Sequence, residues 1–385
     1  MKQRQYIAYL VTILTALTAC ESNDIPVQHA DSYDYITFAA KTQKLQTRTN
    51  PYEAYNPETH PSTMAVFGYY DIADYGALTQ TRATSTTLPN PIFDNEAVSY
   101  KASEKTWTTA SKSRWDNYRS ATSFDFFGYM PLTTGAKVTR TADNEYTLTI
   151  PFSMPTTESI IFDSRQAPII CALPEHKEGT TAEGDEFTFE RIVNLQFDQT
   201  LTAYRLLFKL DTKMGAMRQF RIKGVSLSGD IATSCNISRT YHWTKNSWTA
   251  DNITWTDINR QQITDADITI PYVESDADNA DNDKQTMLVS TTDYTQWGPA
   301  FYTIPDILFQ PTISVTYDVE FTAEDDSTII TRKDITSSID LNKENFSNLA
   351  TGKTAMINPI RILIQPRYLY VLADEDAYTG HLLIE

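Results

Sequence analysis

Residues Ile313–Phe321 read ISVTYDVEF, and this stretch decides the fold class. Its apolar side chains stand at every second position, with polar side chains between them. Successive side chains of an extended strand point to opposite faces, so the pattern predicts a β-strand with one buried face. The same period-2 alternation recurs along the chain between turn residues, and it predicts many more strands.

The other alternating segments are spread over both halves of the sequence. They are Tyr35–Ala39, Met64–Tyr70, Ser123–Tyr129, Tyr146–Pro151, Pro168–Leu173, Val193–Phe197, Tyr204–Leu210, Phe220–Leu227, Ala232–Ile237, Ile268–Val273, Thr286–Ser290, Ala300–Ile304, Thr328–Ile335 and Ile360–Ile364. No long stretch has apolar residues at a 3.6-residue period, which argues against helical bundles and parallel α/β folds. With 22 Tyr and 17 Phe, the composition also suits pleated, half-buried surfaces.

We therefore expect an all-β protein with two tandem antiparallel β-sandwich domains of the transthyretin or immunoglobulin type. The turn residues Ser228-Gly229-Asp230 separate two strand segments and suggest the boundary. This gives an N-terminal domain at 35–228 and a C-terminal domain at 229–385. Leu45–Pro61 (LQTRTNPYEAYNPETHP) lacks alternation and reads as a long exposed linker within the first domain.

The first twenty residues, MKQRQYIAYLVTILTALTAC, have a basic start and a short apolar run. These features are typical of a secretory signal peptide, here residues 1–19. Leu17-Thr18-Ala19-Cys20 resembles the bacterial lipobox, which implies cleavage between Ala19 and Cys20 and lipid on the Cys20 thiol. The polar residues 20–34 then read as a tether between the lipid and the fold.

The net charge of −17 argues against a nucleic-acid partner, because phosphate-backbone binding needs a basic surface. Cys171 and Cys235 remain besides Cys20, and we expect two buried free thiols, with a disulfide as the alternative. The acidic loop Ser275–Lys284 fails the EF-hand pattern, because Asp281 and Met287 stand where Gly and Glu are needed. No His pair has zinc-site spacing. We expect no metal, no cofactor and no enzymatic activity.

Trp243, Trp248 and Trp255 lie within thirteen residues. Exposed indole rings could stack on sugars, although core and hairpin packing is the commoner use of such residues. They support one candidate function, that of a permanently lipid-anchored surface lipoprotein that binds glycans. It is the alternative to the function given below.

Several short segments resemble, in order, those of the Bacteroidetes fimbrillin-like (Mfa-like) family of type V pilus subunits. They are Ile36-Thr37-Phe38 followed by Thr47-Arg48, then Val66–Tyr70, Phe124–Pro131 (FDFFGYMP), Val193–Thr202 (VNLQFDQTLT), Val225–Gly229 and Ile360–Pro366. Gln199 stands where the family commonly has His. The resemblance spans nearly all of the sequence after the signal peptide.

The resemblance implies a fimbrial subunit that reaches the outer membrane as a lipoprotein and then joins an extracellular fimbrium with a role in adhesion. An Arg-specific protease would cut between Arg48 and Thr49, after the first strand at Tyr35, Ile36, Thr37, Phe38 and Ala39. The strand would leave with its lipid, and a strand from a neighbouring subunit would fill the groove. We expect Ile36 and Phe38 to face the core, rather than Tyr35 and Thr37.

The family would place the donor strand at the C-terminus, where Leu382, Leu383 and Ile384 form an apolar patch. The alternative is a last strand that pairs within its own domain. Thr81-Arg82-Ala83 also matches the family's cleavage pattern, but it follows the second expected strand. Arg48 and the C-terminal tail favour the stalk of the fimbrium over its tip, and either over its anchor, but the sequence does not decide among the three positions.

Overall fold

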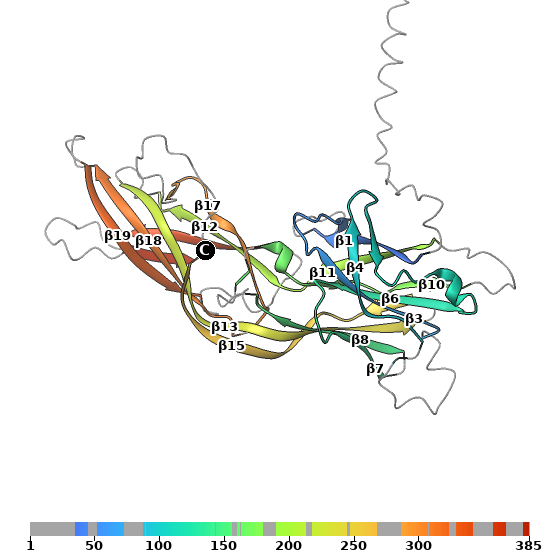
Figure 1. Cartoon of the computed structure of the whole chain (residues 1–385). Coiled ribbons are helices and arrows are strands. Elements are labelled where there is room, and N and C mark those ends of the chain that lie inside the picture. Colours follow the sequence, from blue (N-terminus) through green and yellow to red (C-terminus); the bar gives the residue numbers. More distant parts are fainter. Residues whose placement is uncertain are drawn as a thin grey trace, which may run out of the picture.

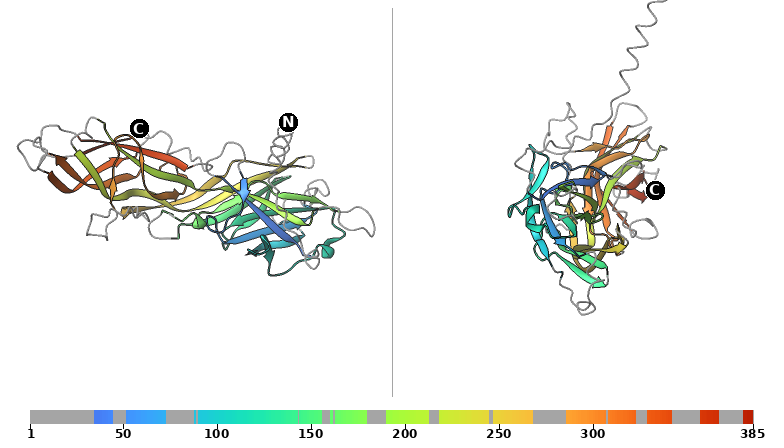
Figure 2. Two further views of the ribbon diagram at one scale, coloured as in Figure 1. Left: turned by 90° about the horizontal axis from the view of Figure 1, so that it is seen from above. Right: turned by 90° about the vertical axis from the view of Figure 1, so that its right-hand side faces the viewer.

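The computed structural model shows an elongated molecule with two lobes (Figures 1 and 2). It describes residues 35–44, 52–72, 88, 90–142, 144–155, 160–161, 163–179, 190–212, 218–244, 247–267, 286–306, 308–322, 329–341, 357–366 and 380–384. Regular structure in this part of the chain consists of strands and two 3-10 turns, η3 (Trp115–Tyr118) and η4 (Ser164–Gln166). None of its helices has the length and apolar character of a membrane span.

A nine-stranded sheet forms one layer of the first lobe. It contains β1 (Thr37–Gln43), β2 (Tyr52–Ala54), β3 (Thr63–Tyr70), β4 (Pro91–Lys101), β5 (Thr106–Thr109), β6 (Ser123–Met130), β9 (Ile169–Cys171), β10 (Glu175–Glu178) and β11 (Ile192–Gln199). The order is β10-β6-β3-β4-β5-β1-β11-β9, and β2 pairs with β1. An additional pairing joins β9, at one end of this path, to β6, the second strand from the other end. The sheet therefore curls toward a barrel.

An eight-stranded sheet runs through both lobes. It contains β7 (Lys137–Ala142), β8 (Glu145–Ser153), β13 (Arg218–Thr244), β14 (Ser247–Ala250), β15 (Thr254–Asp267), β16 (Met287–Leu288), β18 (Thr312–Thr322) and β19 (Ile329–Asp340). A four-stranded sheet covers it in the second lobe, with β12 (Thr202–Leu210), β17 (Thr295–Thr303), β20 (Ile357–Pro366) and β21 (Gly380–Ile384).

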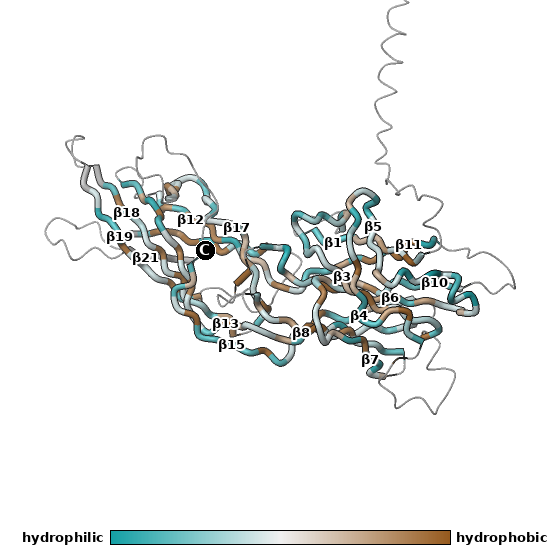
Figure 3. Tube along the Cα trace, viewed as in Figure 1, coloured by the Kyte–Doolittle hydropathy of each residue, from teal (hydrophilic) through white to brown (hydrophobic). Residues whose placement is uncertain are grey.

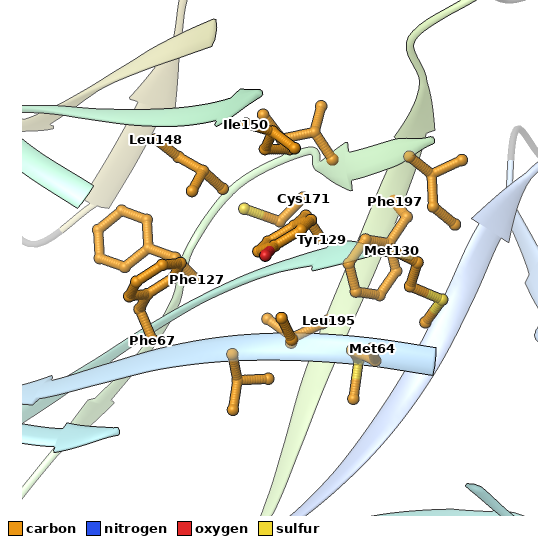
Figure 4. Packing of buried hydrophobic residues seen from close by; sticks show 14 of the residues in the cluster. Met64, Phe67, Phe127, Tyr129, Met130, Leu148, Ile150, Cys171, Leu195 and Phe197 are labelled. Carbon is orange, nitrogen blue, oxygen red and sulfur yellow. The ribbon is translucent and has the colours of Figure 1, made fainter. Parts of the chain in front are cut away.

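Each lobe has its own apolar core between two layers. The first core joins the nine-stranded sheet to β8 and the second half of β13. Figure 4 shows Phe67, Phe127 and Leu195 from one layer facing Leu148 and Ile150 of β8. The second core lies between β18 and the first half of β13 on one side and β12 and β20 on the other.

The stretch ISVTYDVEF forms most of β18, as its alternation predicts. The side chains of Ile313, Val315, Tyr317 and Val319 are buried, whereas Ser314, Thr316 and Asp318 between them are half-buried. The hydropathy colouring in Figure 3 also changes repeatedly along the strands of both lobes. The prediction of an all-β sandwich fold is confirmed, although β1–β11 and β12–β20 pair in parallel.

The predicted turn at Ser228-Gly229-Asp230 is wrong, because β13 continues through it as one strand of 27 residues. Gly229 has φ +145, and the register with β15 shifts between Leu227 and Gly229. The turn residues therefore make a bulge. Residues on both sides of position 228 contribute to each core, and the domain boundary there stays a prediction.

Candidate functional site

Strand β1 lies inside the nine-stranded sheet, with partners along both edges. On one edge it runs parallel to β11, from Thr37 opposite Ile192 to Thr42 opposite Phe197. On the other edge it runs antiparallel first to β5 and then to β2. Removing β1 would therefore open a slot between β11 and the β5–β2 edge.

The inner face of β1 fills the first core. Ile36 is 1% exposed and Phe38 is fully buried. The Phe38 ring lies edge-on to the rings of Phe93 and Phe126, with centroids 5.8 and 5.9 Å away. The predicted inward face of Ile36 and Phe38 is confirmed, and Thr37 on the opposite face is buried as well.

The start of the strand is held by backbone and ring contacts. The Ile36 N–H donates to the Ser113 carbonyl at 2.9 Å, and Tyr35 forms an isolated bridge with Arg114. The Arg114 guanidinium lies 5.1 Å from the centroid of the Tyr35 ring. Ala39 is half-buried within β1. The segment 35–39 is thus a paired strand, and its departure stays a prediction.

β1 and β2 form an antiparallel pair, with Gln43 opposite Tyr52. The chain that joins them contains Arg48 and Thr49, which lie outside the described residues, as do Ala19 and Cys20. The linker predicted at Leu45–Pro61 is only partly correct, because it includes β2 and the buried Tyr55. Tyr55 packs its ring 4.8 Å from that of Trp107, so this stretch is anchored in the core.

A polar bridge links β2 to β11 and then to β13. The Tyr52 hydroxyl donates to Asp198 Oδ1 at 2.6 Å, and Arg239 Nη1 donates to Asp198 Oδ2 at 2.6 Å. Burial raises the pKa of the Tyr52 phenol well above its usual range, and the bond to Asp198 raises it further. Burial disfavours the charge on Arg239, but the bond to Asp198 together with the charge interactions with Tyr241, Asp198 and Cys171 raises its pKa overall.

Sequence patterns did not reveal this bridge. Tyr52, Asp198 and Arg239 are distant in the chain, so no local spacing relates them. Only the pairing of β1 with both β2 and β11 brings the first two together.

The C-terminal strand β21 pairs antiparallel with β20 of the same chain. Leu382, Leu383 and Ile384 stand opposite Ile364, Leu363 and Ile362. The backbone thus shows the arrangement named as the alternative, a last strand within its own lobe. Donation to a neighbour stays a prediction, and it would require β21 to leave this edge of the sheet.

The tryptophans do not form an exposed platform. Trp243 and Trp248 are buried, with their rings tilted against each other and their centroids 5.1 Å apart, and Trp248 Nε1 donates to Asp125 Oδ1 at 2.8 Å. Trp255 is half-buried and donates to the Thr200 carbonyl. These residues pack and cap the first core.

Neither remaining cysteine forms a disulfide. Cys171 and Cys235 are both buried free thiols, as expected. Within the described ranges, no three His, Cys, Asp or Glu side chains gather closely enough to hold a metal ion.

The fold is similar to that of a solved bacterial fimbrial protein. A fimbrial protein from Bacteroides vulgatus superposes with a TM-score of 0.51 at 16% identity, over 91% of this chain and 98% of that chain. The fimbrial anchor protein Mfa2 from Porphyromonas gingivalis matches with a TM-score of 0.28 at 10% identity, over 90% and 97%. No protein-family model and no curated protein matches the sequence. The first of these structures shows that the chain has the fold of a Bacteroides fimbrial protein.

Proposed function

We propose that this chain is a non-enzymatic structural subunit of a surface fimbria, with a role in adhesion. It would reach the outer membrane as a lipoprotein through Cys20. An Arg-specific protease would then cut between Arg48 and Thr49, and β1 would leave with the lipid. A strand of another fimbrial subunit would take its place, which moves the protein from the membrane into the extracellular fimbrium.

The observation that carries this proposal is the position of β1. It is the first described strand, it is paired on both edges, and its inner face is buried. A single cut between Gln43 and Tyr52 would separate it from every later strand. No other described strand combines this central position with one covalent connection to the rest of the fold.

The energetics favour replacement over a vacant slot. Full burial of a side chain such as Ile36 or Phe38 contributes about 1.5–3 kcal/mol. Loss of β1 also leaves the edges of β5 and β11 without their partner, and such edges recruit other strands. A strand with apolar side chains at alternate positions would restore both kinds of interaction.

Leu382, Leu383 and Ile384 are the proposed donor residues. β21 stands at the end of the order β17-β12-β20-β21, so it has one strand partner in that sheet. It can therefore leave by breaking one ladder.

The test uses residues 21–385 and an Arg-specific protease. We expect an early product that begins at Thr49, followed by concentration-dependent polymers in light scattering and electron microscopy. The Arg48→Gln variant should stay uncut at this site and monomeric, whereas the matched Arg82→Gln variant should polymerise like the wild type. Polymers should be absent when the cut chain lacks residues 380–385.

A different outcome would favour the alternative lipoprotein. If the chain cut at Arg48 stays monomeric at all concentrations and the intact chain binds glycans, the fimbrial proposal fails.

A further inference from the structure

The bridge from Tyr52 to Asp198 crosses the width of β1. Gln43 pairs with Tyr52 on one side, and Thr42 pairs with Phe197 on the other. Gln43 and Asp198 are the next residues along these two parallel strands. The bond of 2.6 Å between the Tyr52 hydroxyl and Asp198 Oδ1 therefore joins the two neighbours of β1 directly.

This bridge continues into the second layer of the lobe. Asp198 forms an ion pair with Arg239 of β13 at 2.6 Å. The side chain of Asp198 is 16% exposed and that of Arg239 is 14% exposed. Arg239 Nε also donates to the Asp251 carbonyl at 3.1 Å. A partly buried, charge-assisted pair of this kind is stronger than an exposed one and holds the Asp198 carboxylate in one orientation. Tyr52 is thus tied to a fixed acceptor.

The bridge matters because β2 is attached to the sheet through β1. Among the described strands, β2 pairs with β1, and the Tyr55 N–H donates to the Ala40 carbonyl of β1. Both sets of bonds would be lost with β1. The contacts of β2 that do not involve β1 include the Tyr52 bridge at one end and the buried Tyr55 ring at the other.

We infer that the Tyr52–Asp198–Arg239 bridge keeps β2 in place after β1 leaves, so that the slot prefers strands long enough to pair with β2. This inference rests on the proposed function. β2 pairs with Lys41, Thr42 and Gln43, whereas β5 pairs with Thr37 and Phe38. A short strand would reach β5 and the first part of β11, whereas a longer one would also pair with the β2 edge and with Gln196 and Phe197 of β11.

The test compares two fluorescent peptides on the full chain cut at Arg48, below the concentration at which it polymerises. The long peptide is YITFAAKTQ (residues 35–43), and the short peptide is YITFAA (residues 35–40). We expect the wild type to bind the long peptide about tenfold more tightly, the effect of roughly two ordinary hydrogen bonds. Tyr52→Phe removes only the hydroxyl, and its preference should fall below about threefold on the same basis.

Two further variants sharpen the result. Tyr317→Phe removes a hydroxyl that bonds Ser337 at 3.0 Å in the second lobe, and it should keep the wild-type preference. Asp198→Asn keeps an acceptor for Tyr52 but loses the ion pair, so we expect an intermediate preference. Hydrogen exchange at the β2 amides of the cut chain should be faster in Tyr52→Phe than in the wild type.

The outcomes separate this inference from the proposal beneath it. If neither peptide binds the cut wild-type chain, the slot does not open and the proposed function fails. If both peptides bind but Tyr52→Phe and Asp198→Asn keep the wild-type preference and β2 protection, the slot is real and the bridge has no such role.

Discussion

Phe38 contributes the largest buried side chain of β1. Its ring lies between Phe93 of β4 and Phe126 of β6, and it is fully buried. Interiors are packed densely, so neighbouring rings cannot collapse fully into the space that a smaller residue would leave. Much of the packing energy that keeps β1 in the sheet therefore comes from this residue.

Phe38→Ala should destabilise the uncut chain by about 3–5 kcal/mol, as expected for loss of a buried ring. Lys41→Ala changes an exposed residue of the same strand and should cost no more than about 0.5 kcal/mol. Urea unfolding of the uncut protein measures both. Similar losses in the two variants would show that β1 is not held by its inner face.

His60 gives the first lobe a pH-dependent element. It is buried, and its ring lies 6.2 Å from that of Tyr55, which anchors the end of β2. Burial lowers the pKa of His60, while the Asn56 backbone and Glu53 act against this shift. The folded state therefore holds the neutral imidazole and binds a proton less readily than the unfolded chain.

Stability should accordingly fall as the pH drops below about 6.5, the ordinary value for His. The His60→Gln variant has no imidazole at this position, so it lacks this pH-dependent contribution to the unfolding free energy. The difference in unfolding free energy between wild type and variant should therefore narrow from pH 7.5 to pH 5.5, as measured by urea unfolding. A gap that stays constant or widens toward acid would contradict this assignment.

Close packing between strands limits side-chain size at the element scale. A Cβ on Gly128 of β6 would lie 2.8 Å from Leu195 Cδ1 and 3.3 Å from Phe197 Cζ, both on β11. Strand β11 is the parallel partner of β1. Gly128 thus lets β11 approach β6 at the wall of the proposed slot.

Gly128→Ala should cost about 1–3 kcal/mol, because Leu195 or Phe197 must move to admit the methyl group. Gly224→Ala is the matched control, since a Cβ there meets nothing within 4 Å. It should be neutral or slightly stabilising, because alanine has less freedom in the unfolded chain. Thermal unfolding of the two variants should give a lower melting temperature for Gly128→Ala than for Gly224→Ala. Equal melting temperatures would contradict the expected contact.

The whole molecule depends on β13, which runs through both lobes (Figure 1). Its first half pairs with β18 in the second lobe, and its second half pairs with β8 in the first lobe. Both cores therefore lose part of one layer if this strand unfolds. Such a shared element favours unfolding as a single cooperative unit.

Ile237→Ala in the first core should therefore lower protection in the second lobe as well. Ile237 is fully buried, and its truncation should cost about 2–5 kcal/mol. Hydrogen exchange of the β18 amides, in conditions where they exchange by global unfolding, should speed up with that of β3. Unchanged protection in β18 would mean that the lobes unfold independently.

The sequence by itself determined the strands whose two faces differ in polarity. β18 and the inward face of β1 follow directly from period-2 alternation, because one face of each meets a core. β15 (TWTDINRQQITDAD) escaped detection because it is mostly polar and exposed, and its pairing with β13 defines it as a strand. The turn residues around Gly229 were misread, since a bulge uses the same residue types as a turn.

The tertiary structure decided what surrounds the first strand. Alternation placed Ile36 and Phe38 inward, but it carried no information on which strands flank them. The parallel pairing with β11 joins residues that lie 155 positions apart in the chain, such as Thr37 and Ile192, and the bond from Tyr52 to Asp198 spans 146 positions. Local sequence sets which face of a strand is buried, whereas the partners of its edges depend on the order of strands in the folded sheet.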